Sequence, residues 1–150
     1  MAKSNRYLIA AGVISALISL LHVIAVFVPG LYRYISPGQG SELAQLAVQG
    51  SSLTTLLTAI LALIFAVWAI YAFSGAGWLP RLPLLQAALV VIGAIYFLRA
   101  LFLPTEINMV MTQGLPIRSV VFSTISLAAG LLYLIGFFRY RASLRLSQKS

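Results

Sequence analysis

The fold is decided by the stretch YLIAAGVISALISLLHVIAVFV, residues 7–28, which contains no charged residue. Three similar apolar stretches follow at residues 53–73, 84–103 and 117–138. Each is about 20 residues long, the length at which an α-helix crosses ~30 Å of hydrocarbon. The sequence therefore predicts an all-α membrane protein. We expect a four-transmembrane-helix antiparallel bundle that forms a single domain over residues 1–150.

The composition agrees with a chain that lies mostly inside a bilayer. It is 61% hydrophobic and 8% charged, with a mean hydropathy of +1.02, unlike an average soluble domain. The absence of cysteine excludes a disulfide, a thiolate metal site and a cysteine nucleophile. The net charge of +8 in such a protein concerns orientation and anionic lipid, and we expect no nucleic-acid partner.

The basic residues predict the orientation of the chain. Four spans place both termini on one side, and seven of the ten basic residues lie there: Lys3, Arg6, Arg81, Arg139, Arg141, Arg145 and Lys149. The other side holds Arg33, Arg118 and the nearby Arg99. The positive-inside rule then predicts cytoplasmic termini, in a bacterial inner membrane. The first span is too long for an ordinary signal peptide, so we interpret it as a retained signal anchor.

The connections and ends of the spans are also predicted. In the long first outer loop, residues 41–49 have the pattern of a short amphipathic helix at the membrane surface. Pro104 and Pro116 are expected to bracket the last outer loop. The basic tail, residues 139–150, is interpreted as a fraying continuation of the fourth helix that meets anionic lipid. Several aromatic residues are expected at the inner interface: Trp68, Tyr71, Trp78, Tyr133 and Tyr140.

Each predicted helix has one seam of small or polar residues, the kind of face through which membrane helices pack. In the first helix the seam is Gly12, Ser15, Ser19 and His22; in the second it is Thr55, Ala59, Ala62 and Ala66. In the third it is Gln86, Gly93 and Ala100; in the fourth it is Ser119, Ser123, Ser126, Gly130 and Tyr133. These seams predict the interior of the bundle.

His22 is the only histidine, and it lies in the outer half of the first span. A polar group at that depth needs a partner and marks a candidate functional site. One interpretation is a neutral histidine with an interhelical hydrogen bond; the other is a ligand-binding or proton-carrying group. The lone histidine argues against a metal or bis-histidine haem site within one subunit, although one axial histidine, or two from a dimer, stays open.

Arg99 is the second polar group inside the spans. Its long side chain could extend to the head groups, or it could form an ion pair with Glu106 or Glu42, because a charge in a low-dielectric site needs a partner. Charged and polar residues gather at the same outer end, and we interpret them as one ligand-binding pocket: His22, Arg33, Glu42, Tyr96, Arg99, Glu106 and Arg118. A polar pocket over an apolar floor suits an amphiphile or a small anion.

Two classes of function follow. The first is a binding or accessory protein that holds a lipid, a quinone-like amphiphile or a small solute. The second is a small proton-linked transporter or membrane enzyme that uses His22. No recognisable catalytic motif favours an enzyme, and the sequence indicates no particular cofactor. The layout of four helices with a polar outer side resembles DoxX-type small bacterial membrane proteins. A homo-oligomer or a larger membrane complex stays open.

Overall fold

The computed structural model describes residues 4–31, 45–46, 49, 51–114 and 116–147. Among them are five α-helices and one short 3-10 helix, with no strand. In chain order these elements are α1 (Arg6–Phe27), η1 (Pro29–Leu31), α4 (Ser52–Ala76), α5 (Leu85–Ala100), α6 (Leu103–Gln113) and α7 (Arg118–Ser147). The predicted amphipathic helix at residues 41–49 lies mostly outside the described residues, although Gln45 and Leu46 are helical.

Four segments are long and apolar enough to cross a membrane: α1, α4, α5 with α6, and the greater part of α7. Their exposed surfaces are rich in leucine, isoleucine, valine and phenylalanine, which is the surface that lipid tails require and water disfavours. The protein is therefore a small multi-pass membrane protein. The predicted all-α fold, a four-helix transmembrane bundle, is confirmed.

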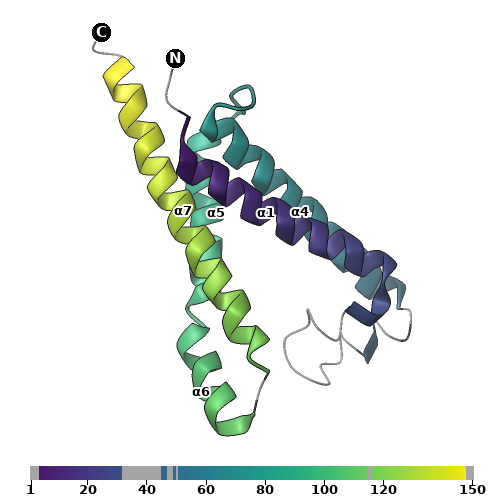
Figure 1. The fold of residues 1–150 in the computed structure, drawn as a ribbon. Helices are drawn as coiled ribbons and strands as arrows, with labels where there is room; N and C mark the ends of the chain where they lie inside the picture. The colour runs from purple at the N-terminus through teal and green to yellow at the C-terminus, as the bar shows by residue number, and fades with distance from the viewer. Residues whose placement is uncertain (1–3, 32–44, 47–48, 50, 115, 148–150) are drawn as a thin grey trace.

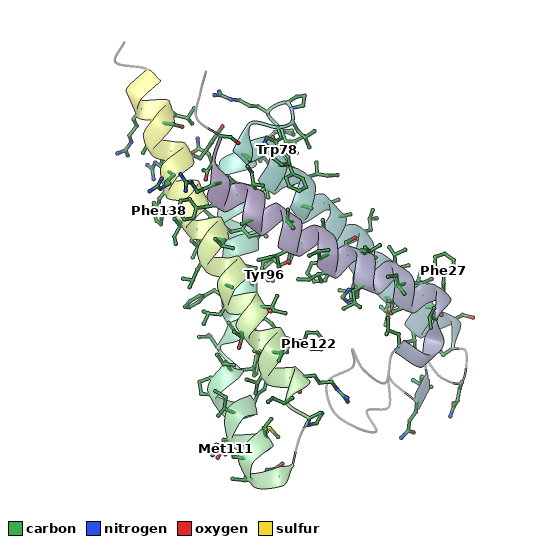
Figure 2. The ribbon with its side chains drawn as sticks, viewed as in Figure 1. Phe27, Trp78, Tyr96, Met111, Phe122 and Phe138 are labelled. Carbon is green, nitrogen blue, oxygen red and sulfur yellow. The ribbon has the colours of Figure 1, made fainter. Side chains whose placement is uncertain are left out.

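The helices pack as two pairs, α1 with α4 and α5 with α7. Figure 1 shows the pairs meeting near the two chain termini and diverging away from them. We call these the terminal end and the distal end of the bundle. The core lies where the pairs meet, and its fully buried side chains include Leu8, Leu89 and Tyr133. At this contact Tyr96 lies between the pairs (Figure 2).

Two glycines allow the close approach of α5 to α7. A Cβ atom added at Gly130 would lie 3.0 Å from the backbone nitrogen of Phe97 and 3.1 Å from the carbonyl oxygen of Gly93. Lipid tails are as apolar as leucine, so helix association in a bilayer depends on such short backbone contacts. The seams of the first and fourth helices are confirmed, because their small residues are buried and His22 is half-buried.

The predicted seam of the second helix is wrong in register. Thr55 and Ala59 are exposed, whereas Thr54 and Thr58 are buried and lead into Ala62. Adjacent threonines at positions 54 and 55 make the two registers equally polar in the sequence, and only packing against α1 selects between them. In the third helix Gly93 and Ala100 are buried as predicted, whereas Gln86 is exposed.

The predicted outer loop between Pro104 and Pro116 is largely helical. Pro104 lies in the first turn of α6, where the missing N–H costs nothing because the first helical N–H groups have no partner within the helix. The helix is interrupted at residues 101–102, before the proline, and a new helix then runs to Gln113. The basic tail continues α7 as predicted, as far as Ser147.

Candidate functional site

At the centre of the bundle, three hydroxyl groups connect the two helix pairs. The Ser15 Oγ atom lies 3.0 Å from the hydroxyl oxygen of Tyr96 and 3.0 Å from that of Tyr133. The Tyr133 hydroxyl donates to the carbonyl oxygen of Trp68 at 2.9 Å. These bonds join α1, α4, α5 and α7 at one point.

Donor counting fixes the direction of this chain. A carbonyl oxygen only accepts, so the single hydroxyl proton of Tyr133 is used on Trp68. Ser15 must then donate to Tyr133, and Tyr96 must donate to Ser15. The chain ends on a backbone carbonyl, which cannot pass a proton on. We therefore assign it a structural role. Tyr96, predicted as a ligand-binding residue, is a member of this network.

The network also corrects the predicted aromatic belt. Tyr133 is fully buried, and its hydroxyl is bonded within the protein, not at a head-group interface. Trp68 contacts the ring of Tyr96 at a centroid distance of 5.1 Å. The sequence shows Ser15 and Tyr133 only as members of two packing seams, and their hydrogen bond depends on the crossing of two distant helices.

The predicted ion pair between Arg99 and Glu106 is present. Nη1 of Arg99 lies 3.1 Å from Oε1 of Glu106 and donates to Oγ of Ser123 at 2.6 Å. Ser123 in turn donates to Oε2 of Glu106. This closed ring links α5 to α6 across the helix break and links both to α7. The sequence places Ser123 only in a packing seam, so its role in the ring was missed.

His22 lies on the other helix pair. Its Nδ1 atom is 2.7 Å from the carbonyl oxygen of Ile18, one turn earlier in α1. Its ring contacts Phe65 at a centroid distance of 5.3 Å, and Phe65 contacts Trp68 at 5.2 Å and Tyr96 at 6.1 Å. Within the described residues, the structure therefore joins His22 to the aromatic cluster of Phe65, Trp68 and Tyr96 and gives it no direct contact with Arg99 or Glu106.

Of the three remaining predicted site residues, Arg118 is described by the structure, whereas Arg33 and Glu42 are not. Arg118, the first residue of α7, is half-buried, and its Nε atom is buried without a hydrogen-bond partner among the described residues. At the distal end of the other pair, the Thr54 hydroxyl is also buried and has no partner in the described part of the chain. Among the described residues, no group of histidine and carboxylate side chains is placed to hold a metal ion.

Comparisons of the chain with protein-family models, with curated proteins and with solved structures find no match. The fold and the site define the class of the protein, a small multi-pass α-helical membrane protein. Its activity has to be argued from its own residues.

Proposed function

We propose that the protein binds an amphiphile whose head group carries a hydroxyl, as a quinol does, beside His22 on the face of α1 that is turned toward the second helix pair. The observation that carries this proposal is the hydrogen bond from His22 to its own helix. A carbonyl oxygen only accepts, so Nδ1 must hold a proton to bond to Ile18. In the neutral ring, Nε2 is then an acceptor. No partner within the described residues occupies it.

The surroundings of His22 suit an amphiphile. Phe65, Trp68 and Tyr96 form an aromatic surface next to the histidine ring, and ring faces contact a planar or hydrocarbon group well. Ser15 and His22 lie seven residues apart on one face of α1, and Ser15 contacts Tyr96 of α5 and Tyr133 of α7. That face of α1 is therefore turned toward the second pair, and the pairs diverge with distance from the chain termini (Figure 1).

The second pair supplies further polar groups at the distal end. Arg99 is 39% exposed although it is paired with Glu106, and Arg118 has a buried nitrogen that no described residue partners. We propose that these residues border the head-group side of the site, while the hydrocarbon chain leaves between the pairs into the bilayer. Arg33 and Glu42 belong to the same hypothesis on the basis of the sequence.

Tryptophan fluorescence tests this proposal, because the chain has only two tryptophans. In a Trp78→Phe background, Trp68 alone reports on the aromatic cluster beside His22. We expect a brominated fatty alcohol to quench Trp68 saturably, and its methyl ether, which cannot donate, to bind about fivefold more weakly, the effect of one hydrogen bond. His22→Leu should remove the difference between the two ligands.

Leu20→Ala is the matched control, because Leu20 is 53% exposed on the same helix and should leave both affinities unchanged. Equal quenching by the alcohol and the ether in the unmodified background would refute an acceptor role for His22. Proton flux into proteoliposomes that depends on His22 would instead favour the alternative, a proton-linked transporter or membrane enzyme.

We also propose that the termini face the cytoplasm of a bacterial inner membrane, as the basic residues predict. The chain has no cysteine, so single introduced cysteines report cleanly. Ala142→Cys at the terminal end should be shielded from an impermeant maleimide in intact cells, and Gln113→Cys at the distal end should react. Both positions are exposed. The opposite labelling pattern would invert the orientation.

A further inference from the structure

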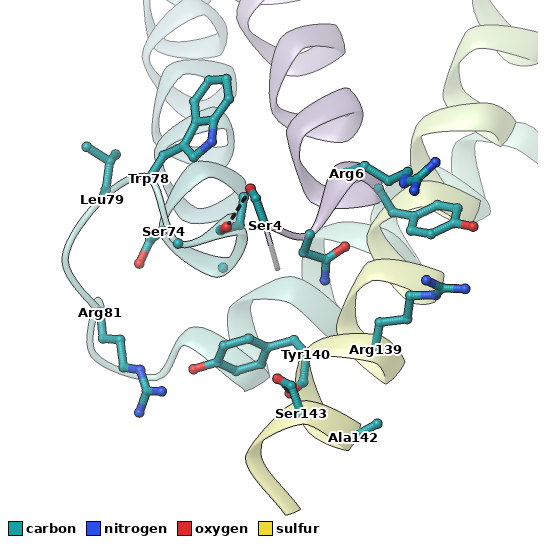
Figure 3. Close-up of a pocket in the computed structure, with 15 residues that line it drawn as sticks. Ser4, Arg6, Ser74, Trp78, Leu79, Arg81, Arg139, Tyr140, Ala142 and Ser143 are labelled. Atoms are coloured by element: carbon teal, nitrogen blue, oxygen red, sulfur yellow. Dashed lines mark hydrogen bonds between the residues drawn. The ribbon is translucent and has the colours of Figure 1, made fainter. Parts of the chain in front are cut away.

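A pocket of about 690 Å³ lies at the terminal end, remote from His22. Its lining comes from the start of α1, the end of α4, the turn before α5 and the last part of α7. Figure 3 shows Arg6 and Arg139 on one side of it and Arg81 on the other. The only acidic residues of the chain are Glu42 and Glu106, and neither is part of the described lining.

One residue of the pocket lining, Asn5, joins the start of α1 to α7. Asn5 donates from Nδ2 to the carbonyl oxygen of Gly136 at 2.8 Å. Because that carbonyl only accepts, the amide orientation is fixed and Oδ1 must be the other atom. Oδ1 has no hydrogen-bond partner among the described residues, and it is buried, so a ligand in the pocket does not reach it. Asn5 makes no side-chain hydrogen bond that caps α1, so the partial positive charge at the N-terminal end of that helix can attract an anion.

We infer that this pocket binds the head group of an anionic glycerophospholipid, with its phosphate among the arginines. Three arginines without a carboxylate select a net negative ligand. The arginines stand on two sides of the pocket (Figure 3), which suits an extended head group better than a single small anion.

The position of the pocket favours a lipid over a free phosphate ester. It lies at the ends of α1, α4 and α7, all long enough to span a membrane. Trp78 and Leu79 border it with 60% and 41% of their surface exposed. Such exposed apolar side chains beside arginines are typical of a head-group interface. Volumes of about 300–1,000 Å³ are usual for small-ligand sites.

Trp78 lines the pocket and serves as its reporter in a Trp68→Phe background. The protein is reconstituted in phosphatidylcholine bilayers with brominated phosphatidylglycerol, and quenching of Trp78 gives the relative affinity of the two lipids. We expect phosphatidylglycerol to bind at least fivefold more tightly than phosphatidylcholine. Brominated phosphatidic acid, which carries the phosphate without the glycerol group, should also bind more tightly than phosphatidylcholine.

Matched variants separate the pocket from general attraction to a basic tail. Replacing Arg6, Arg81 and Arg139 with glutamine should abolish the preference, and Arg81→Gln alone, on an exposed turn, should lower it about twofold. Replacing Arg141 and Arg145, which lie on the same helix end outside the pocket lining, should preserve it. An equal loss of the phosphatidylglycerol preference in both sets of variants, or no such preference in the unmodified protein, would overturn the proposal that this pocket binds the lipid. Relief of the quenching by millimolar glycerol phosphate would overturn the lipid assignment in favour of a soluble ester.

Discussion

Replacing Gly130 with valine is expected to separate α5 from α7 and to destabilise the bundle by about 3 kcal/mol or more, at the upper end of the cost of overpacking. The new side chain would meet Phe97 and Gly93 through their backbone atoms, at 3.0 and 3.1 Å from the Cβ position. A flexible side chain could turn away from such a contact, but a helix backbone has to move as a whole. The α5–α7 pair would therefore open.

The free energy of unfolding, measured by SDS titration in mixed micelles, checks this prediction. Ala128→Val is the control, because Ala128 is exposed on the same helix two residues away and should tolerate the added carbon atoms. Gly130→Ala should fall between the two, since only one Cβ atom must be accommodated. A Gly130→Val protein as stable as the Ala128→Val protein would show that α5 and α7 are free to separate without cost.

The sequence predicts the four spans well because the signal is local. A run of about 20 apolar residues must be helical in a bilayer, where every backbone polar group has to be satisfied within its own segment. The seams of α1 and α7 are also visible in the sequence, because serine and glycine recur there at helical spacing in otherwise large apolar helices. Ser123 and Gly130, two residues of the α7 seam, are buried as this spacing predicts.

Other features depend on contacts between distant segments and could not be predicted. Pro104 can end one helix or begin the next, and the sequence around it is compatible with both. Thr54 and Thr55 differ only in which helix face they occupy. The hydroxyl chain through Ser15 requires α5 and α7 to meet α1 at one height. The divergence of the two pairs has no local signal, so the sequence could not show that His22 lies on one pair while Arg99 and Glu106 lie on the other.

The same reasoning explains why one ion pair was predicted correctly. Arg99 and Glu106 are seven residues apart in the chain, so either a continuous or a briefly interrupted helix places them on one face, about two turns apart. The pairing with Ser123 depends on α7 and was missed. Arg99, Glu106 and Ser123 thus form a polar ring that joins α5, α6 and α7 at the distal end of the bundle.

Replacing Arg99 with leucine is therefore expected to destabilise the protein by about 2–3 kcal/mol, somewhat less than the loss of one partner of a fully buried pair. Glu106 would keep its charge with only 14% of its side chain exposed and would lose its cationic partner. The 39% exposure of Arg99 moderates the effect, because solvent or head groups already screen the pair. If Arg99 only extended to the head groups, Arg99→Leu would instead leave the free energy of unfolding unchanged.

A double-mutant cycle in bilayer-like micelles isolates the pair. Glu106→Leu alone should also be destabilising, whereas the combined Arg99→Leu and Glu106→Leu protein should recover most of the loss, because no charge is left unpaired. Ser123→Ala should cost about 2 kcal/mol or more, because it removes two hydrogen bonds, both to charged groups. Additive single effects would contradict a functional ion pair. They would mean that Ser123 and helix packing alone hold α6 against α7, and that Arg99 is available to bind a ligand at the distal end.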